Sequence, residues 1–289
     1  MRGIAPRTLA PLVSAAALLV AATAAPAALA AGNYVAMGDS YTSAPGVQPA
    51  AAGAPPECGR SANNYPHLVA GALGLTLTDV SCGGAATRNF EEAQFEDQPP
   101  QFDALSTSTD IVTIGMGGND GGLFGTLMGG CTELDIVQKR PGKAPCAAAY
   151  QSFVTSTFAA DRGPQEAALR RVRQLAPHAK VFVVGYPEVT PQGGSCPAFP
   201  LYPGDLRWFR NKFERVGNAQ FKSVAKTNGA IFVDTFKPSI GHNACTPVGT
   251  RWIEPLLESL TGVAVHPNAQ GEQQDAVVVE QSMQAHGVQ

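Results

Sequence analysis

Four short segments of this 289-residue chain contain residues that could carry out acyl transfer. The first is Gly38-Asp39-Ser40. A glycine two residues before a serine relieves crowding in a sharp turn, so that the hydroxyl can project as a nucleophile. Taken alone, the same tripeptide is more often a turn followed by a serine that caps a helix. Ser40 therefore becomes a candidate nucleophile only if other segments supply a base and an oxyanion site.

Two glycine-rich segments could supply hydrogen-bond donors to a negatively charged oxygen. In Ser81-Cys82-Gly83-Gly84-Ala85, paired glycines let backbone N–H groups approach a ligand closely, although a tight turn held by a disulfide is an equal alternative. In Gly115-Met116-Gly117-Gly118-Asn119-Asp120, a side-chain amide follows flexible backbone and could donate to the same oxygen. An asparagine and an aspartate after glycines also form ordinary turns, so each segment needs the support of the others.

A serine nucleophile needs a general base, and the chain contains five histidines. Three of them are expected at the surface: His67, His178 and His286. His242 lies in a short loop next to a cysteine, which accounts for it structurally. His266 opens His266-Pro267-Asn268-Ala269-Gln270-Gly271, where the proline makes the backbone rigid, and it is the preferred base.

The hydropathy pattern places these segments at the ends of predicted elements. Short apolar runs predict five buried strands at Tyr34–Met37, Leu75–Val80, Ile111–Ile114, Val181–Val184 and Ile231–Val233. Helical spacing predicts helices at Tyr65–Leu73, Pro164–Leu175, Pro203–Thr227 and about Ala269–Gln284. Strands separated by helices indicate an α/β protein with a parallel sheet covered on both faces, a three-layer α/β/α sandwich. Ligands bind beyond the carboxyl ends of such strands, which is where the serine and both glycine-rich segments fall.

Two stretches do not fit regular elements. Ala44–Pro56 and Thr126–Ala147 are rich in alanine, glycine or proline, and both are predicted to be loops. Their small and apolar residues would form much of the wall of a binding site.

Composition excludes several classes of protein. With 44% hydrophobic residues, 15% charged residues and a net charge of −3, intrinsic disorder and a nucleic-acid partner are both disfavoured. The first thirty residues have the form of a signal peptide: a positive start with Arg2 and Arg7, an apolar stretch Leu9–Ala25, and Ala28-Leu29-Ala30 before the cleavage site. The rival interpretation, a retained membrane anchor, is weakened by two prolines and many alanines. We therefore expect a signal peptide over residues 1–30, cleavage near Ala30 and Ala31, and one secreted domain over residues 31–289 without a membrane span.

Export to an oxidising compartment favours disulfides over a zinc site. The chain has six cysteines: Cys58, Cys82, Cys131, Cys146, Cys196 and Cys245. The sequence alone cannot choose among their pairings. We take sequential pairing, which would close three local loops, as the working hypothesis.

Taken together, the segments resemble the SGNH (GDSL) hydrolases. Gly38-Asp39-Ser40, Gly84 in Cys-Gly-Gly-Ala, Asn119 in Gly-Gly-Asn-Asp and His266 in His-Pro-Asn-x-x-Gly occur in that family's order. The chain is most similar to its secreted bacterial lipase and esterase branch, which shares Tyr-Val-Ala-x-Gly-Asp-Ser-Tyr, the Cys-Gly-Arg-Ser that begins at Cys58 and the six-cysteine layout. The resemblance implies a flavodoxin-like sheet of about five strands and three sequential disulfides.

Carried over residue by residue, the resemblance implies a role for each segment. Ser40 would be the nucleophile, and its own N–H, the Gly84 N–H and the Asn119 amide would form the oxyanion hole. His266 would be the base. The substrate would be a small-molecule or lipid ester, no metal or organic cofactor would be needed, and the protein would act as a monomer.

One position departs from the family's pattern. Many members carry an aspartate three residues before the histidine, but here that residue is Val263. The acids nearest in sequence, Glu254, Glu258 and Glu272, have no reason from spacing to face the ring. We therefore predict a Ser-His dyad in which the backbone carbonyl of Val263 or Ala264 accepts the imidazole Nδ1–H.

Three other residues could be taken for parts of the site. Asp39 and Asp120 lie in sharp turns, where carboxylates usually accept backbone N–H groups, so we assign them structural roles. Trp252 could form a wall of the site or fill the core, and we slightly favour the wall.

Other activities compatible with the same residues are acyl transfer to an alcohol and deacetylation of glycans. A secreted binding domain without catalysis is a further alternative, but Ser40, Asn119 and His266 are all present. An α/β-hydrolase lipase is disfavoured because its G-x-S-x-G motif is missing from the chain. Few aromatic residues stand out as sugar platforms, so acyl esters are favoured over acetylated polysaccharide.

Overall fold

Five parallel strands form the centre of the computed structural model, which describes residues 1, 3 and 32–289. In chain order they are β1 (Asn33–Gly38), β2 (Thr76–Asp79), β3 (Ile111–Gly115), β4 (Lys180–Val184) and β5 (Ile231–Val233). Their order in the sheet, β2-β1-β3-β4-β5, is flavodoxin-like and has its switch point between β1 and β3. The predicted fold class and all five predicted strands are confirmed. The predicted cleavage site and nearly all of the predicted signal peptide lie outside the described residues.

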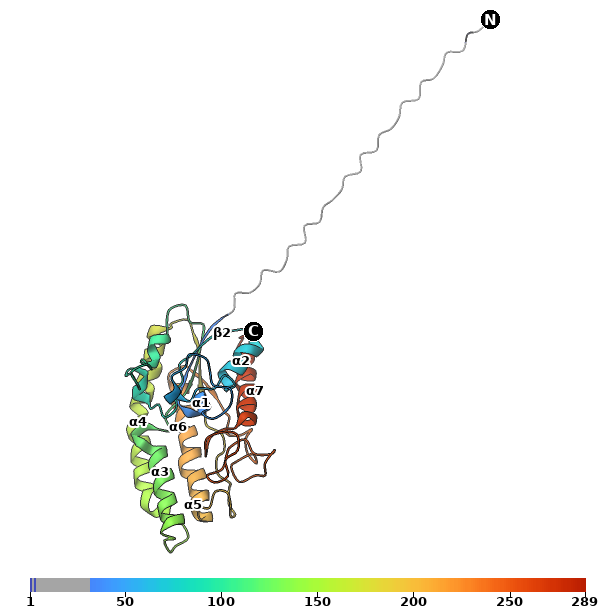
Figure 1. The fold of residues 1–289 in the computed structure, drawn as a ribbon. Helices are drawn as coiled ribbons and strands as arrows, with labels where there is room; N and C mark the ends of the chain where they lie inside the picture. Colours follow the sequence, from blue (N-terminus) through green and yellow to red (C-terminus); the bar gives the residue numbers. More distant parts are fainter. Residues whose placement is uncertain (2, 4–31) are drawn as a thin grey trace. The chain divides into compact units, whose positions relative to one another are not determined.

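Helices cover both faces of the sheet (Figure 1). On one face lie α2 (Tyr65–Leu73) and α7 (Ala269–Ala285), which pack side by side. On the other face lie α4 (Pro145–Leu175) and α6 (Arg215–Thr227). The result is the expected three-layer sandwich.

Strand β1 shows how the sequence builds these two cores. Its side chains alternate between faces, so Val35 and Met37 join the core under α4 and α6, while Tyr34 and Ala36 join the core under α2 and α7. All four are nearly inaccessible to solvent. A strand buried on both sides ends at Gly38, and the chain turns there into the candidate site.

The stretch predicted as a loop between Thr126 and Ala147 is mostly helical, and that prediction is wrong. Helix α3 (Leu123–Thr132) runs into a π-helical turn, η5 (Glu133–Val137), and α4 begins soon afterwards at Pro145. Gly130 of α3 lies against the Tyr150 ring of α4, where a Cβ would come within 2.2 Å of the tyrosine hydroxyl. The glycine therefore permits close packing of two helices rather than marking a break in one.

Two predicted helices also differ in extent. Helix α4 continues through Pro164, which the sequence suggested as a helix start. The predicted helix Pro203–Thr227 consists of α5 (Pro203–Trp208), a π-helical stretch η6 (Phe209–Glu214) and α6. The remaining short elements are α1 (Ser40–Ser43) and the 3-10 turns η1 (Pro56–Cys58), η2 (Thr87–Phe90), η3 (Gln101–Ala104) and η4 (Asp120–Gly122).

The six cysteines pair sequentially, as Cys58–Cys82, Cys131–Cys146 and Cys196–Cys245. This pairing agrees with the working hypothesis and closes three local loops. Within the part of the chain that the structure describes, no helix has the length and apolar character to cross a membrane.

Candidate active site

Ser40 stands at the first turn after β1. Asp39 caps the short helix α1 by accepting a hydrogen bond from the Tyr41 N–H at 2.9 Å, which leaves the Ser40 side chain at the start of the helix. A Cβ on Gly38 would collide with Thr42 and with the Gly115 carbonyl, so the turn requires glycine at that position. The crowding expected from the sequence is therefore real.

His266 lies directly opposite the serine. Its Nε2 is 2.7 Å from the Ser40 Oγ, although the two residues are 226 positions apart in the chain. Both side chains are largely buried. An imidazole at this distance can accept the hydroxyl proton.

The other ring nitrogen of His266 defines which nitrogen carries the proton. Nδ1 lies 2.8 Å from the carbonyl oxygen of Ala264. Because a carbonyl can only accept, Nδ1 must donate, and the neutral ring then presents Nε2 as an acceptor to the serine. Among the described residues no carboxylate contacts Nδ1, and Val263, at the position where many family members have aspartate, donates its N–H to the Pro45 carbonyl. Burial lowers the pKa of His266 from its ordinary value, and the bond to Ala264 partly opposes this.

The segment before the histidine is held in an unusual conformation. Val265 has φ of 65°, a left-handed value that is costly for a β-branched residue. The Tyr41 hydroxyl donates to its carbonyl at 2.6 Å, and its N–H donates to the Glu254 carbonyl at 2.9 Å. The Tyr41 ring also packs beside the His266 ring, with centroids 5.1 Å apart. Residues next to the serine thus help to fix the histidine.

The three predicted oxyanion donors lie at the carboxyl ends of β1, β2 and β3. Within the described residues the N–H groups of Ser40 and Gly84 make no hydrogen bond. The Asn119 Nδ2 donates one hydrogen to the Ala85 carbonyl at 3.1 Å, which leaves its second N–H free. Gly84 has φ of 75°, so its peptide orientation depends on the absence of a side chain.

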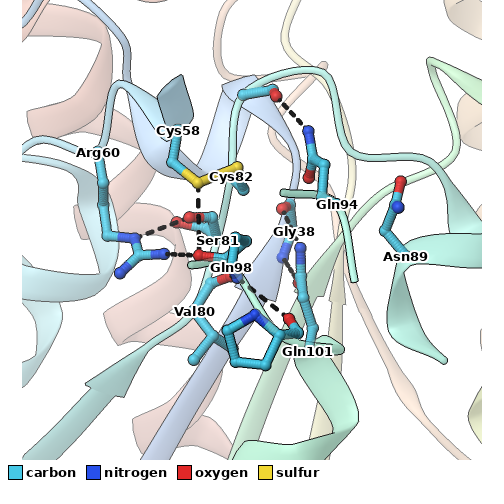
Figure 2. Close-up of a disulfide and its surroundings, with 12 residues drawn as sticks. Gly38, Cys58, Arg60, Val80, Ser81, Cys82, Asn89, Gln94, Gln98 and Gln101 are labelled. Carbon is cyan, nitrogen blue, oxygen red and sulfur yellow. Dashed lines mark hydrogen bonds between the residues drawn. A yellow bond between two sulfur atoms is a disulfide. The ribbon is translucent and has the colours of Figure 1, made fainter. Parts of the chain in front are cut away.

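Figure 2 shows what supports the Gly84 segment. The Cys58–Cys82 disulfide ties it to the preceding loop, and the Gly83 N–H donates to the Cys58 carbonyl at 2.9 Å. On the other side, the Gln94 Nε2 donates to the Gly83 carbonyl at 2.7 Å. The residue before Gly84 is therefore held through both its N–H and its carbonyl.

A buried glutamine supports the end of β1 in the same view. The Gln101 Oε1 accepts the Gly38 N–H at 2.8 Å, and its Nε2 donates to the Gly38 carbonyl at 3.0 Å (Figure 2). The Gln101 side chain thus gives the Gly38 N–H its partner beyond the point where β2 stops pairing with β1, and it shares the Gly38 carbonyl with the Cys82 N–H. Nothing in the sequence pattern singled out this residue.

Asp39 also joins two parts of the site. The Tyr186 hydroxyl donates to its carboxylate and accepts the Gly118 N–H at 2.9 Å. One hydroxyl therefore links the residue before Ser40 to the residue before Asn119. Burial raises the pKa of Asp39 to about 7, against the opposing effect of the Tyr186 hydrogen bond.

A cavity opens beside the serine, and the space within it and at its mouth, open solvent included, is about 460 Å³. Most of its wall is apolar, with aromatic side chains from α3, α4, η6, α6 and the segment after β4: Phe124, Phe158, Phe213, Phe221 and Tyr186. Ser40 and Asn119 lie at its polar side. The predicted loop Ala44–Pro56 is not part of this wall, and the aromatic residues that form it were not predicted because their helices lie far apart in the chain.

Two acidic residues border the cavity, Asp39 and Glu214. Both carboxyl oxygens of Glu214 accept hydrogen bonds from the turn after β4: Oε2 from the Val189 N–H at 3.1 Å, and Oε1 from the Thr190 N–H at 2.9 Å and the Thr190 hydroxyl at 2.6 Å. Burial raises the pKa of Glu214 to about 8. The carboxyl group is turned toward this turn, which it fastens to η6.

The remaining candidates lie outside the reacting groups. Asp120 accepts hydrogen bonds from the N–H and hydroxyl of Thr87, both at 2.6 Å. Trp252 stacks on His242 with centroids 4.1 Å apart and does not line the cavity, so the preference for a wall role is wrong. The ring is instead used to pack the loop that carries His242.

Comparison with known proteins gives a consistent result. The model of the GDSL-like Lipase/Acylhydrolase family matches residues 36–274. Lipase 2 of Streptomyces coelicolor is 41% identical over 248 residues, which are 84% of this chain and 83% of that protein. Phospholipase A1 from Streptomyces albidoflavus superposes with a TM-score of 0.72 at 29% identity, covering 88% of this chain and 100% of that chain. An extracellular lipase from Streptomyces rimosus superposes with a TM-score of 0.71 at 27% identity, covering 87% and 100%.

Proposed function

The chain belongs to the GDSL-like lipase/acylhydrolase family, and from this premise we propose that it is a secreted lipase or carboxylesterase that works through an acyl-Ser40 intermediate. The observation that carries the proposal is the 2.7 Å separation of the Ser40 Oγ and the His266 Nε2. The commitment of Nδ1 to the Ala264 carbonyl supports it, because Nε2 is then free to take a proton.

Acylation begins when the Ser40 Oγ attacks the ester carbonyl and its proton passes to the His266 Nε2. The carbonyl oxygen becomes negative and accepts hydrogen bonds from the Ser40 N–H, the Gly84 N–H and the Asn119 amide. His266 then gives its proton to the departing alcohol oxygen as the ester C–O bond breaks. Water, deprotonated by the same imidazole, attacks the acyl-enzyme and releases the acid.

A backbone carbonyl replaces the usual carboxylate in this mechanism. The Ala264 oxygen holds the tautomer and the orientation of the ring, which are the principal tasks of the third member of a triad. It carries only a partial charge and so stabilises the transient imidazolium less than a carboxylate would. Proton transfer in this mechanism therefore depends on two side chains, Ser40 and His266, without a third carboxylate.

The wall of the cavity indicates the acyl part of the substrate. Phenylalanine rings from four helical elements surround a space that begins at Ser40, which suits an alkyl chain better than a sugar ring. The names of the relatives, a phospholipase A1 and two lipases, agree with an ester of a fatty acid. We infer that the acyl chain enters this cavity and the alcohol leaves toward solvent.

Secretion follows from the first thirty residues and from the disulfides. The signal-peptide pattern predicts cleavage near Ala30, and three disulfides suit an oxidising compartment. The similar Streptomyces rimosus enzyme is described as an extracellular lipase. We infer that the mature protein acts outside the cell.

The test is hydrolysis of p-nitrophenyl esters by wild type and by Ser40→Ala. We expect the variant to fall to the background rate. Ser43→Ala is the matched control. It removes a buried hydroxyl from the same short helix, and that hydroxyl makes no hydrogen bond within the described residues. Equal rates for wild type and Ser40→Ala would overturn the proposal.

A second variant tests the oxyanion hole. Asn119→Ala removes one donor and should lower kcat by about 10²- to 10³-fold while the circular dichroism spectrum stays that of wild type. Turnover at the wild-type rate would remove Asn119 from the site and leave the role of Ser40 intact.

A further inference from the structure

We propose that Gly217 determines how long an acyl chain the cavity accepts. The inference rests on the proposed function, since it assumes that the acyl group on Ser40 extends into the cavity. It adds the residue that sets the depth of that cavity.

Gly217 lies in the first turns of α6, where its backbone does not need a glycine. Its φ is not in the left-handed region, so an alanine could adopt the same conformation. Glycine inside a helix is unfavourable relative to alanine because it loses more conformational freedom on folding. The benefit of glycine at this position must therefore come from the space that its missing side chain leaves.

That space lies between two rings of the cavity. A Cβ on Gly217 would approach the Phe158 ring to 3.2 Å and the Phe221 ring to 3.6 Å. Gly217 and both rings line the cavity, as does Phe213, which stacks on Phe158 with centroids 6.1 Å apart. Even a methyl group would force Phe158 to move or would occupy room between the rings.

Gly217 and Ser40 line the same cavity. Phe124 packs edge-on against His266 at 5.7 Å, and Tyr186 packs against Phe221 at 5.6 Å. These aromatic contacts join the wall beside Ser40 to the part of the wall around Gly217. An acyl chain extending from Ser40 along this wall would stay in contact with apolar surface until it reached Gly217.

Burial of a chain along this route predicts a dependence on length. Each buried methylene group contributes roughly a fourfold gain in binding. We expect kcat/KM of wild type to rise from acetate to octanoate, and a side chain at Gly217 to cancel the gain for the longer esters more than for acetate.

The experiment compares p-nitrophenyl acetate, butyrate, octanoate and dodecanoate with wild type, Gly217→Ala and Gly71→Ala. Gly71 of α2 is the control, because a Cβ there would meet nothing within 4 Å. We expect the octanoate-to-acetate ratio of kcat/KM to fall about tenfold or more in Gly217→Ala and to remain at the wild-type value in Gly71→Ala. An unchanged ratio, or an equal loss on all four esters, would overturn the inference.

Phe158→Leu provides a second measurement that does not depend on the folding of Gly217→Ala. It enlarges the same part of the cavity and should raise the dodecanoate-to-octanoate ratio. A fall or no change in that ratio would contradict the inference. Failure of wild type to hydrolyse any of the four esters would instead refute the proposed function, so the two failures are distinct.

Discussion

The environment of His266, the proposed base, favours the neutral form of its ring. Burial lowers its pKa below the usual 6.5, so the unprotonated form that can accept the Ser40 proton persists to lower pH. We expect kcat/KM for an uncharged ester to stay level as the pH falls to 6.5 and to decline only below that value. Initial rates measured between pH 4.5 and 9 test this.

Asp39, next to Ser40 in the chain, is another group whose protonation could lower kcat/KM as the pH falls. Burial raises its pKa to about 7, so a decline in rate caused by its protonation would be centred near neutral pH and not below 6.5. Asp39→Asn removes this titration and leaves His266 in place. A decline that persists below pH 6.5 in Asp39→Asn belongs to His266, whereas a decline centred near pH 7 in wild type that disappears in the variant would contradict the assignment.

Tyr186 positions two catalytic segments at once. Its hydroxyl joins Asp39, before the nucleophile, to Gly118, before the Asn119 amide. In Tyr186→Phe the ring remains in the cavity wall but both hydrogen bonds are lost. We expect kcat to fall about tenfold, equivalent to ~1.4 kcal/mol of transition-state stabilisation, with little change in KM for a short ester.

Tyr34→Phe is the control for that substitution. Tyr34 is a buried tyrosine whose hydroxyl bonds the Thr113 hydroxyl at 2.8 Å on the face covered by α2 and α7. The variant should lower the melting temperature and leave kcat near wild type. A similar loss of kcat in both variants would show that Tyr186 acts only through stability.

At the residue scale, sequence reasoning identifies the groups that follow strands. Ser40, Gly84 and Asn119 each come directly after an apolar run and within a glycine-rich turn, so their convergence could be expected from the topology of a parallel sheet. Gln101 and Tyr186 could not be found in this way. Their contacts join residues 63 and 147 positions apart, and neither lies in a recognisable motif.

Two adjacent glycines of α3 are expected to have opposite effects on the stability of the fold. Gly129 and Gly130 are adjacent in α3, but a Cβ on Gly129 would meet nothing within 4 Å and a Cβ on Gly130 would overlap the Tyr150 ring. We expect Gly129→Ala to raise the free energy of unfolding by up to ~1 kcal/mol and Gly130→Ala to lower it by ~1–3 kcal/mol. Urea titration followed by circular dichroism measures both.

The two variants make the same change, glycine to alanine, at neighbouring positions, and we expect opposite effects on the free energy of unfolding. Destabilisation by both variants would mean that the helix itself does not tolerate the substitution, and stabilisation by both would mean that Tyr150 moves away without cost. Either result would contradict the packing explanation for the glycine pair.

The same pair explains why α3 was predicted as a loop. Five strands and most helices were predicted because their apolar residues repeat with the period of the element. Between Thr126 and Ala147 the glycines and prolines resemble loop residues, and only the position of Tyr150 shows that a glycine is needed for helix packing. The wall of the cavity was missed for the same reason, since it forms where helices distant in the chain meet.

Several buried carboxyl groups that form no ion pair within the described residues make the stability of the molecule depend on pH. Burial raises the pKa of Asp39 to about 7 and the pKa values of Glu214 and Asp275 to about 8. A carboxyl group with a higher pKa in the folded state than in the unfolded chain binds more protons when folded. The contribution of these groups to the free energy of unfolding therefore decreases as the pH rises from about 4 toward 8.

Asp275 is the best residue with which to isolate this effect. It lies buried on α7, makes no hydrogen bond within the described residues, and owes its raised pKa to burial. Asp275→Asn keeps the shape of the side chain and removes the charge. Because the unfolded value is near 3.8 and the folded value about 8, the variant should match wild type at pH 4 and melt ~3 °C or more above it at pH 8.

Thermal unfolding at matched scan rates across this range decides the prediction, with Asp97→Asn at an exposed position as the control. The control should follow wild type at every pH, because an exposed carboxylate gives up no hydration when the chain folds. A melting temperature for Asp275→Asn that stays parallel to wild type from pH 4 to 8 would mean that Asp275 is ionised at no cost. The pH dependence would then have to come from other buried carboxyl groups, among them Asp39, Glu214 and Glu272. A lower melting temperature at pH 8 would show that the charge itself stabilises the fold.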